Sequence, residues 1–185
     1  MITDNQLTIL WRILDGQKYI VLRNYESLTA QLNSGKDVDL LCESKEQVVS
    51  ILEAHSLSTR DDSYSYFTDI LGQRILVDVR EIGDDYYDSK WEAEMISNRR
   101  KFSDFYIADY DDYQYSLLYH SLIHKSEIGE KYLAQFKEIF GTIDKNRLIK
   151  CLADYMREKK FKASIPLDSG VEFNYENYSL LISCL

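Results

Sequence analysis

The chain has 185 residues and a formal net charge of −9, from 31 acidic and 22 basic side chains. This length fits one compact domain, or a domain with a helical appendage. Because binding to a nucleic-acid backbone needs clustered Lys and Arg, the acidic balance argues against a large nucleic-acid partner but is compatible with a nucleotide or a small phosphorylated substrate. The cysteines, Cys42, Cys151 and Cys184, lack metal-ligand spacing, and no apolar run approaches membrane-spanning length, so we expect a cytoplasmic protein with no membrane span.

Helical and extended segments alternate through the first half of the chain. Apolar residues at helical spacing predict a helix over residues 3–16, with Thr3 as its N-cap and Gly16 at its end. Apolar runs and turn residues then predict, in order, a strand over 18–23, a short helix over 26–32, a strand over 37–43, a helix over 45–55 capped by Ser44, and two strands around a turn near Gly72.

From about residue 83 the pattern becomes helical. Four helices are predicted, over residues 89–99, 109–125, 126–140 and 144–160. The tail over residues 165–181 is expected to be irregular or partly extended. The predicted fold class is α+β, with a small mixed sheet, flanking helices and a helical C-terminal half. We expect an α+β core over residues 1–100 and a helical region over residues 101–185 that packs on this core.

Two aspartates stand one residue apart in the segment GKDVDLL. Side chains alternate between the faces of a strand, so Asp37 and Asp39 share one face, with their Cα atoms about 6.5 to 7 Å apart. Two carboxylates this close resist joint ionisation unless a cation lies between them, and Mg²⁺ is the oxygen-seeking ion that fits. The alternative is that they only end a turn, because a single D-x-D pattern also recurs by chance.

A third acid interrupts the apolar segment RILVDVRE. Asp78 stands at the centre of this strand, where a carboxylate is costly to bury without a partner. One explanation is a structural ion pair with Arg80, Arg74 or Arg23. The other is that three carboxylates from neighbouring strands hold two Mg²⁺ ions, which favours a catalytic role. The predicted catalytic and metal-binding residues are Asp37, Asp39 and Asp78.

The segments KYIVLRNYESL, GKDVDLL and RILVDVRE resemble the strands of the DNA polymerase β-like nucleotidyltransferase superfamily. More narrowly, YIVLRNYE, GKDVDLL, IGDDYYDSKWE, YQYSLLYHSLIHK and SGVEFN, within residues 19–174, resemble an uncharacterised minimal nucleotidyltransferase family of bacterial surface-polysaccharide gene clusters. In the superfamily, a D-x-D strand and a third acid bind two Mg²⁺ ions and a nucleotidyl group is transferred. The resemblance implies Mg²⁺ or Mn²⁺, a nucleoside triphosphate, a small acceptor and an association with polysaccharide-biosynthesis enzymes.

The chain departs from the superfamily at the end of the first predicted strand. A Gly-Ser pair usually stands there and cradles phosphate, whereas this chain has Leu22, Arg23 and Asn24. An arginine can instead clamp a phosphate through two parallel hydrogen bonds. The substitution also favours a second interpretation, in which the fold has lost its transfer chemistry.

Two histidines and a group of aromatic residues are further candidates. His120 and His124 lie four residues apart in the helix predicted over residues 109–125 and so share a face, beside Lys125. Two histidines alone make a poor zinc site, and core histidines are the other alternative. With the resemblance, we expect all three residues to line the cleft opposite the acids. Three aromatic residues that rim the same cleft could stack on a base or sugar, namely Tyr86, Tyr87 and Trp91. The alternative is that they belong to the core, as most such residues do.

The sequence supports three hypotheses of function. The first is a Mg²⁺-dependent nucleotidyltransferase acting on a sugar, a sugar phosphate or a related surface-polysaccharide precursor. The second is a catalytically degenerate nucleotidyltransferase-fold module that serves in binding or scaffolding. The third is a toxin-type nucleotidyltransferase that modifies tRNA or protein, which the acidic charge makes awkward for tRNA. The predicted substrate- and phosphate-binding residues are Arg23, Asn24, Arg80, Tyr87, His120, His124 and Lys125.

Overall fold

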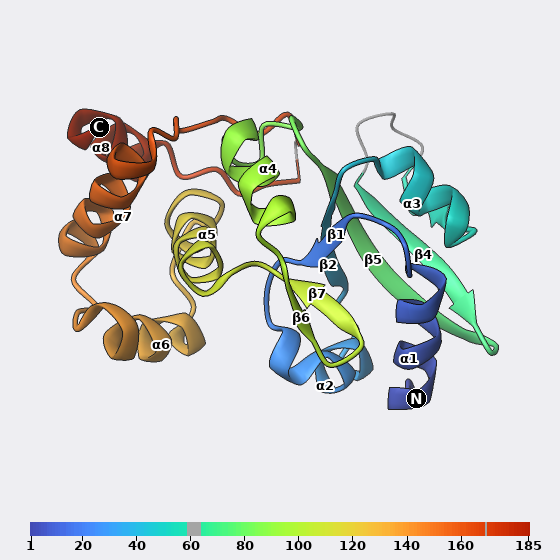
Figure 1. Cartoon of the computed structure of the whole chain (residues 1–185). Coiled ribbons are helices and arrows are strands. Elements are labelled where there is room, and N and C mark those ends of the chain that lie inside the picture. The colour runs from blue at the N-terminus through green and yellow to red at the C-terminus, as the bar shows by residue number, and fades with distance from the viewer. Residues whose placement is uncertain (59–63, 169) are drawn as a thin grey trace.

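The computed structural model describes residues 1–58, 64–168 and 170–185 and shows an α+β fold (Figure 1). Within these residues, seven strands form one mixed sheet in the order β3-β4-β5-β2-β1-β7-β6. The strands are β1 (Tyr19–Val21), β2 (Val38–Cys42), β3 (His55–Ser56), β4 (Ser65–Ile70), β5 (Gln73–Glu81), β6 (Arg100–Phe102) and β7 (Phe105–Ile107). The predicted class of fold is therefore confirmed, and the sheet is larger than the small sheet predicted.

The centre of the sheet is formed by β1, β2 and β5. Strand β2 runs antiparallel to β1 and parallel to β5, and β1 runs parallel to β7. The register of β2 and β5 places Asp39 directly opposite Asp78. The hairpin of β4 and β5 closes at Leu71 and Gly72, which both have positive φ, as the predicted turn requires.

Eight α-helices accompany the sheet in the described part of the chain, with a short 3-10 turn, η1 (Tyr25–Ser27). They are α1 (Asp4–Ile13), α2 (Leu28–Asn33), α3 (Lys45–Ile51), α4 (Ser89–Ser97), α5 (Tyr110–Ile123), α6 (Glu130–Phe140), α7 (Lys145–Lys159) and α8 (Tyr175–Cys184). The predicted caps are confirmed, since Thr3 and Ser44 accept hydrogen bonds from Gln6 and Gln47. Among the described residues, no helix has both the length and the apolar character needed to cross a bilayer.

Each face of the sheet packs against its own set of helices, and Figure 1 shows α1 and α3 on one side and α4 and α5 on the other. The core under α1 and α3 takes alternate strand residues such as Val38, Leu40 and Val79. The opposite core takes Leu22 and Leu41 and continues into α4 to α8. Because Asp39 and Asp78 alternate with the first set, they lie on the face that looks toward α5.

Four elements were not predicted, and the first is β3, where residue 55 was expected to end a helix. Strands β6 and β7 extend the sheet to Ile107, past the expected boundary at residue 100, and β7 pairs with β1 near the sheet centre. The tail was expected to be irregular or partly extended, and its described residues before Tyr175 form no helix or strand, but its second part forms α8. Its Leu181 is fully buried in the helical core, and the Asn177 side chain donates to the carbonyl of Leu122 in α5. Tertiary packing on α5 and α7 thus stabilises a helix whose own sequence pattern is weak.

Candidate functional site

A charged cavity of about 370 Å³ lies between the α5-facing side of the sheet and the helical half. Four acids and four bases line it, namely Asp37, Asp39, Asp78 and Asp168, with Arg23, Lys36, Arg80 and Lys125. Nine of the ten residues predicted for the site belong to this wall: Arg23, Asn24, Asp37, Asp39, Asp78, Arg80, His120, His124 and Lys125. The described structure thus brings together residues that are up to about a hundred positions apart in the sequence.

Two arginines of the cavity form ion pairs with three of its acids. A guanidinium nitrogen of Arg23 contacts a carboxylate oxygen of Asp39, and their side chains are only 8% and 13% exposed. Arg80 lies 3.3 Å from Asp78 and 2.5 Å from Asp168, measured between guanidinium nitrogen and carboxylate oxygen. Each predicted catalytic acid on the facing strands therefore has an arginine partner, while a second oxygen of Asp78, Oδ1, is buried without a hydrogen bond in the described residues.

The protonation of these acids is shifted by their surroundings. The pKa of Asp78 is raised to about 7. Burial is the main cause and the nearby Asp39 adds to it, while Arg80 offsets part of the rise. Burial also raises the pKa of Asp39, against the lowering effect of Arg23. A carboxylate with a pKa near neutrality can both accept and return a proton under physiological conditions, which is the property that a general base requires.

Helix α5 contributes two histidines that are neutral. Burial, followed by the charge of Arg23, lowers the pKa of His120 and of His124 well below the usual range. Tyr86 Oη lies 2.7 Å from His120 Nδ1, and Arg23 Nη1 lies 3.2 Å from the same nitrogen. Since a guanidinium only donates, Nδ1 accepts and the imidazole proton is on Nε2. Both ring nitrogens of His124 are buried without a hydrogen-bond partner in the described residues.

Two predicted ligand-binding residues have structural contacts that the sequence did not reveal. Asn24 has a left-handed backbone, and its side-chain oxygen accepts from Lys131 at 2.8 Å. It therefore joins the end of β1 to α6, at the edge of the cavity. Tyr87 does not line the cavity: it is 1% exposed, and its hydroxyl donates to the carbonyl of Ser116. The prediction that Tyr87 stacks on a ligand is wrong, because this ring packs against Trp91 in the helical core.

The sequence reasoning missed Asp168, Lys36 and Tyr132, which also line the cavity. Asp168 comes from the segment between α7 and α8, and nothing in the pattern around it indicates that it returns to the sheet. Lys36 belongs to a turn directly before the D-x-D strand, so its position next to Asp37 was a usable signal. Tyr132 reaches the cavity from α6 and contacts Asn24 at 3.1 Å through its hydroxyl group.

The carboxylates fit a hard divalent cation in chemical kind. Three of them share one face of the sheet, and Asp78 Oδ1 is a buried acceptor that lacks a donor. In their present arrangement, however, no group of three or more His, Cys, Asp or Glu side chains among the described residues could hold a metal ion. The physical reason is that Arg23 and Arg80 contact the same carboxylates. A cation and the two guanidinium groups would compete for these oxygens.

Comparison of the chain with protein-family models, with curated proteins and with solved structures finds no match. The evidence for a function therefore comes from the cavity and from the residues that line it.

Proposed function

We propose that the protein is a Mg²⁺-dependent nucleotidyltransferase of the DNA polymerase β-like type that acts on a sugar, a sugar phosphate or a related surface-polysaccharide precursor. The observation that carries the proposal is the register of β2 and β5, which sets Asp39 beside Asp78 in a cavity that also holds two arginines. Acids of the superfamily stand on neighbouring strands in this way. The proposal includes a cytoplasmic location and an association with polysaccharide-biosynthesis enzymes.

The bases of the cavity supply the binding of phosphate groups. The guanidinium groups of Arg23 and Arg80 can each donate two parallel hydrogen bonds to a phosphate. Lys36 and Lys125 add two further positive charges. The phosphates of a nucleoside triphosphate would replace Asp39, Asp78 and Asp168 as the partners of Arg23 and Arg80. The acids are then free to hold Mg²⁺. This ion, when bound, neutralises charge on the phosphates and activates the acceptor hydroxyl as a nucleophile.

Asp78 is the best candidate for the general base. In the proposed reaction an acceptor hydroxyl oxygen forms a bond to the α-phosphorus, the bond from that phosphorus to pyrophosphate breaks, and the hydroxyl proton passes to a carboxylate. Asp78 suits this step because it lines the cavity and its Oδ1 accepts no hydrogen bond within the described residues, so this oxygen can accept a proton. His120 and His124 line the same cavity as Asp78, and their neutral imidazoles would be uncharged neighbours of the phosphates.

A second function is favoured by one observation. Arg23 stands where the superfamily has its Gly-Ser pair, and it contacts Asp39 directly. A charge-balanced pair of this kind does not need a metal ion, so the same cavity also suits a module that binds a phosphorylated ligand and transfers nothing. The two functions differ in whether the ligand requires a divalent cation.

Calorimetric titration of all four nucleoside triphosphates, with and without Mg²⁺ or Mn²⁺, separates the two functions. For the enzyme we expect one nucleotide to bind at least about tenfold more tightly with the cation, and pyrophosphate to be released when the correct sugar phosphate is added. Asp39→Asn should abolish the cation dependence, whereas Glu138→Gln, at an exposed position of α6, should not. Binding of equal strength with and without the cation supports the binding module. No binding of any nucleotide contradicts the enzyme and leaves only a module whose phosphorylated ligand is not a nucleotide.

A further inference from the structure

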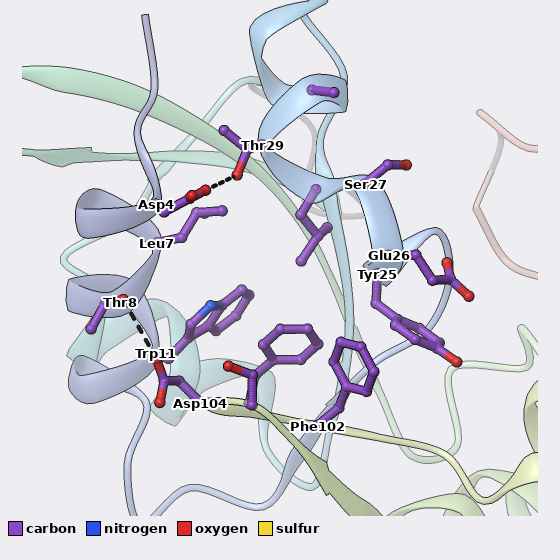
Figure 2. A pocket seen from close by; sticks show the side chains of 14 residues that line it. Asp4, Leu7, Thr8, Trp11, Tyr25, Glu26, Ser27, Thr29, Phe102 and Asp104 are labelled. Carbon is purple, nitrogen blue, oxygen red and sulfur yellow. Dashed lines mark hydrogen bonds between the residues drawn. The ribbon is translucent and has the colours of Figure 1, made fainter.

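A second cavity, of about 510 Å³, lies on the other side of the η1–α2 segment and shares no lining residue with the charged cavity (Figure 2). Its walls come from α1, from η1 and α2, and from the β6–β7 hairpin. Its size is in the usual range for sites that bind small molecules. This cavity plays no part in the proposed transfer reaction, so a ligand assigned to it does not depend on that proposal.

Aromatic rings form one continuous wall of this cavity. Ring centroids are 4.8 Å apart for Trp11 and Phe105, 5.5 Å for Phe105 and Phe102, and 4.8 Å for Phe102 and Tyr25. Trp11 is 4% exposed, yet its indole N–H donates to no acceptor within the described residues, unlike that of Trp91, which donates to Asp112. Trp11 lines the cavity, and its Nε1 is not among the described side-chain atoms that are buried without a hydrogen-bond partner, so this donor is accessible to a ligand.

Carboxylates stand around the rim, and no positive side chain of the described residues lines the cavity. The acids are Asp4 on α1, Glu26 on η1 and Asp104 at the β6–β7 turn. Aromatic faces attract cations through their ring quadrupole, and carboxylates attract them through charge. The lining therefore favours a ligand with an apolar body and a positive group, and it disfavours an anion such as the phosphates that suit the charged cavity.

Two hydrogen bonds join the walls of the cavity to one another. Thr29 of α2 donates to Asp4 of α1 at 2.5 Å, and Thr8 of α1 donates to Asp104 of the hairpin at 3.5 Å, as the dashed lines in Figure 2 show. Each of these bonds uses one carboxylate oxygen and leaves the other free. The site is thus formed before a ligand arrives, which lowers the entropic cost of binding.

We propose that this aromatic cavity binds a small aromatic amine, with its ring against Trp11 and Phe102 and its ammonium group at the carboxylate rim. A neutral oxygen on the ligand would accept the free indole N–H of Trp11. The ligand class is set by three features together, namely the aromatic wall, the indole donor of Trp11 and charged lining residues that, within the described part of the chain, are all acidic.

Tyramine, tyrosol and 4-hydroxyphenylacetate test the proposal, because they share a phenol ring and differ in charge. In calorimetric titrations of the full chain we expect tyramine to bind tightest and 4-hydroxyphenylacetate to bind about tenfold or more weakly, since each partly exposed carboxylate adds a modest attraction. High salt should narrow this gap. The absence of tyramine binding at millimolar concentration, or equal binding of all three probes, would overturn the proposal.

Variants locate the binding within the molecule. Phe102→Ala should weaken the binding of tyramine at least about threefold. Asp104→Asn should reduce the difference in affinity between tyramine and tyrosol. Phe102 is 41% exposed, so its removal leaves the core in place. Ile143→Ala, also at an exposed apolar position, and Glu138→Gln are the matched controls, which account for weak attraction of any cation to a chain of net charge −9. Equal effects of control and test variants, or a change of oligomeric state in Phe102→Ala, would contradict the assignment.

Discussion

At the scale of single residues, the cavity is organised by which arginine pairs with which acid. The sequence left Arg80, Arg74 and Arg23 as alternative partners of Asp78, and the structure separates them. Arg80 pairs with Asp78, whereas Arg23 pairs with Asp39. The guanidinium of Arg74 lies 3.8 Å from the ring centroid of Phe67, outside the cavity. Arg23 is therefore a member of a buried ion pair as well as a candidate for phosphate binding.

Arg23→Met is expected to lower the free energy of unfolding by about 3 kcal/mol, because it leaves Asp39 buried without a partner. The double variant Arg23→Met with Asp39→Leu should recover much of that loss. Urea denaturation measures both. The matched control is Arg100→Met, which breaks a pair with Asp109 whose side chains are each 51% exposed and should cost about 1 kcal/mol or less. Equal losses for the two arginines would show that burial does not set the cost.

Asp78→Asn tests the raised pKa of Asp78 through stability. The pKa is about 7 in the folded state and about 4 in the unfolded chain, so between these values only the folded state holds the proton. The free energy of unfolding of the wild-type protein therefore falls as pH rises from about 4 to about 7. We expect the stability difference between variant and wild type to be near zero at pH 4 and to reach on the order of 2–4 kcal/mol in favour of the variant at pH 8.

Urea denaturation of both proteins across this pH range makes the measurement without added cations. Taking the difference cancels other raised groups that do not interact with Asp78, among them Glu92, whose burial raises its pKa to about 8. Glu138→Gln controls for the change in net charge. A difference that is constant with pH would show that Asp78 is ionised in the folded state throughout.

At the scale of elements, strongly patterned segments could be predicted and weakly patterned ones could not. Helices α1 and α7 carry clear caps and apolar spacing, and β4 and β5 flank a turn with a recognisable glycine. Strands β6 and β7 have three residues each, which is too short for an alternation to be read. Helix α8 needs the surface of α5 and α7 to be stable, and that surface exists only in the folded protein.

Helix α8 depends on its N-cap. The side chain of Asn174 accepts from the backbone N–H of Asn177 at 3.0 Å and donates to the carbonyl of Ser126 at 3.2 Å. We expect Asn174→Ala to lower the free energy of unfolding by about 1 kcal/mol and to speed hydrogen exchange in α8 before other helices. Ser179→Ala, within the same helix, is the control and should have little effect on exchange. Unchanged exchange in Asn174→Ala would show that packing alone fixes α8.

At the scale of the whole molecule, the segment between α7 and α8 joins the helical half to the sheet. The orange-red trace in Figure 1 leaves α7, crosses toward the sheet and returns to α8. On the way Asp168 contacts Arg80 at 2.5 Å. A segment 88 residues further along the chain thus places the carboxylate of Asp168 against Arg80 of the proposed phosphate site. Strand and helix periods set the shared face of Asp37 and Asp39 and that of the two histidines, and the family resemblance assigned the histidines, Lys125 and Arg23 to the cleft. No local pattern could reveal this long-range return of Asp168.

Asp168→Asn should raise the affinity for pyrophosphate about threefold or more, because the carboxylate and the anion compete for Arg80. Calorimetric titration without divalent cations is the measurement. Glu172→Gln is the matched control: it removes an exposed acid of the same segment, one that contacts Ser126 instead of the arginine. Weaker binding in Asp168→Asn, or an equal gain in both variants, would show that Arg80 is not a phosphate ligand.

The parallel pairing of β1 with β7 also governs how the chain folds during synthesis. Val21 pairs with Ile107, so 107 − 21 = 86 residues must be added after β1 before its partner exists. At about 5–20 residues per second, the ribosome needs roughly 4 to 17 s to make them. Until then one edge of β1 has open backbone hydrogen-bonding groups, which are a template for pairing with another chain. A chain that stops at residue 100 lacks β7 and keeps this edge open permanently, so such a chain should associate with other chains more readily than the full chain does.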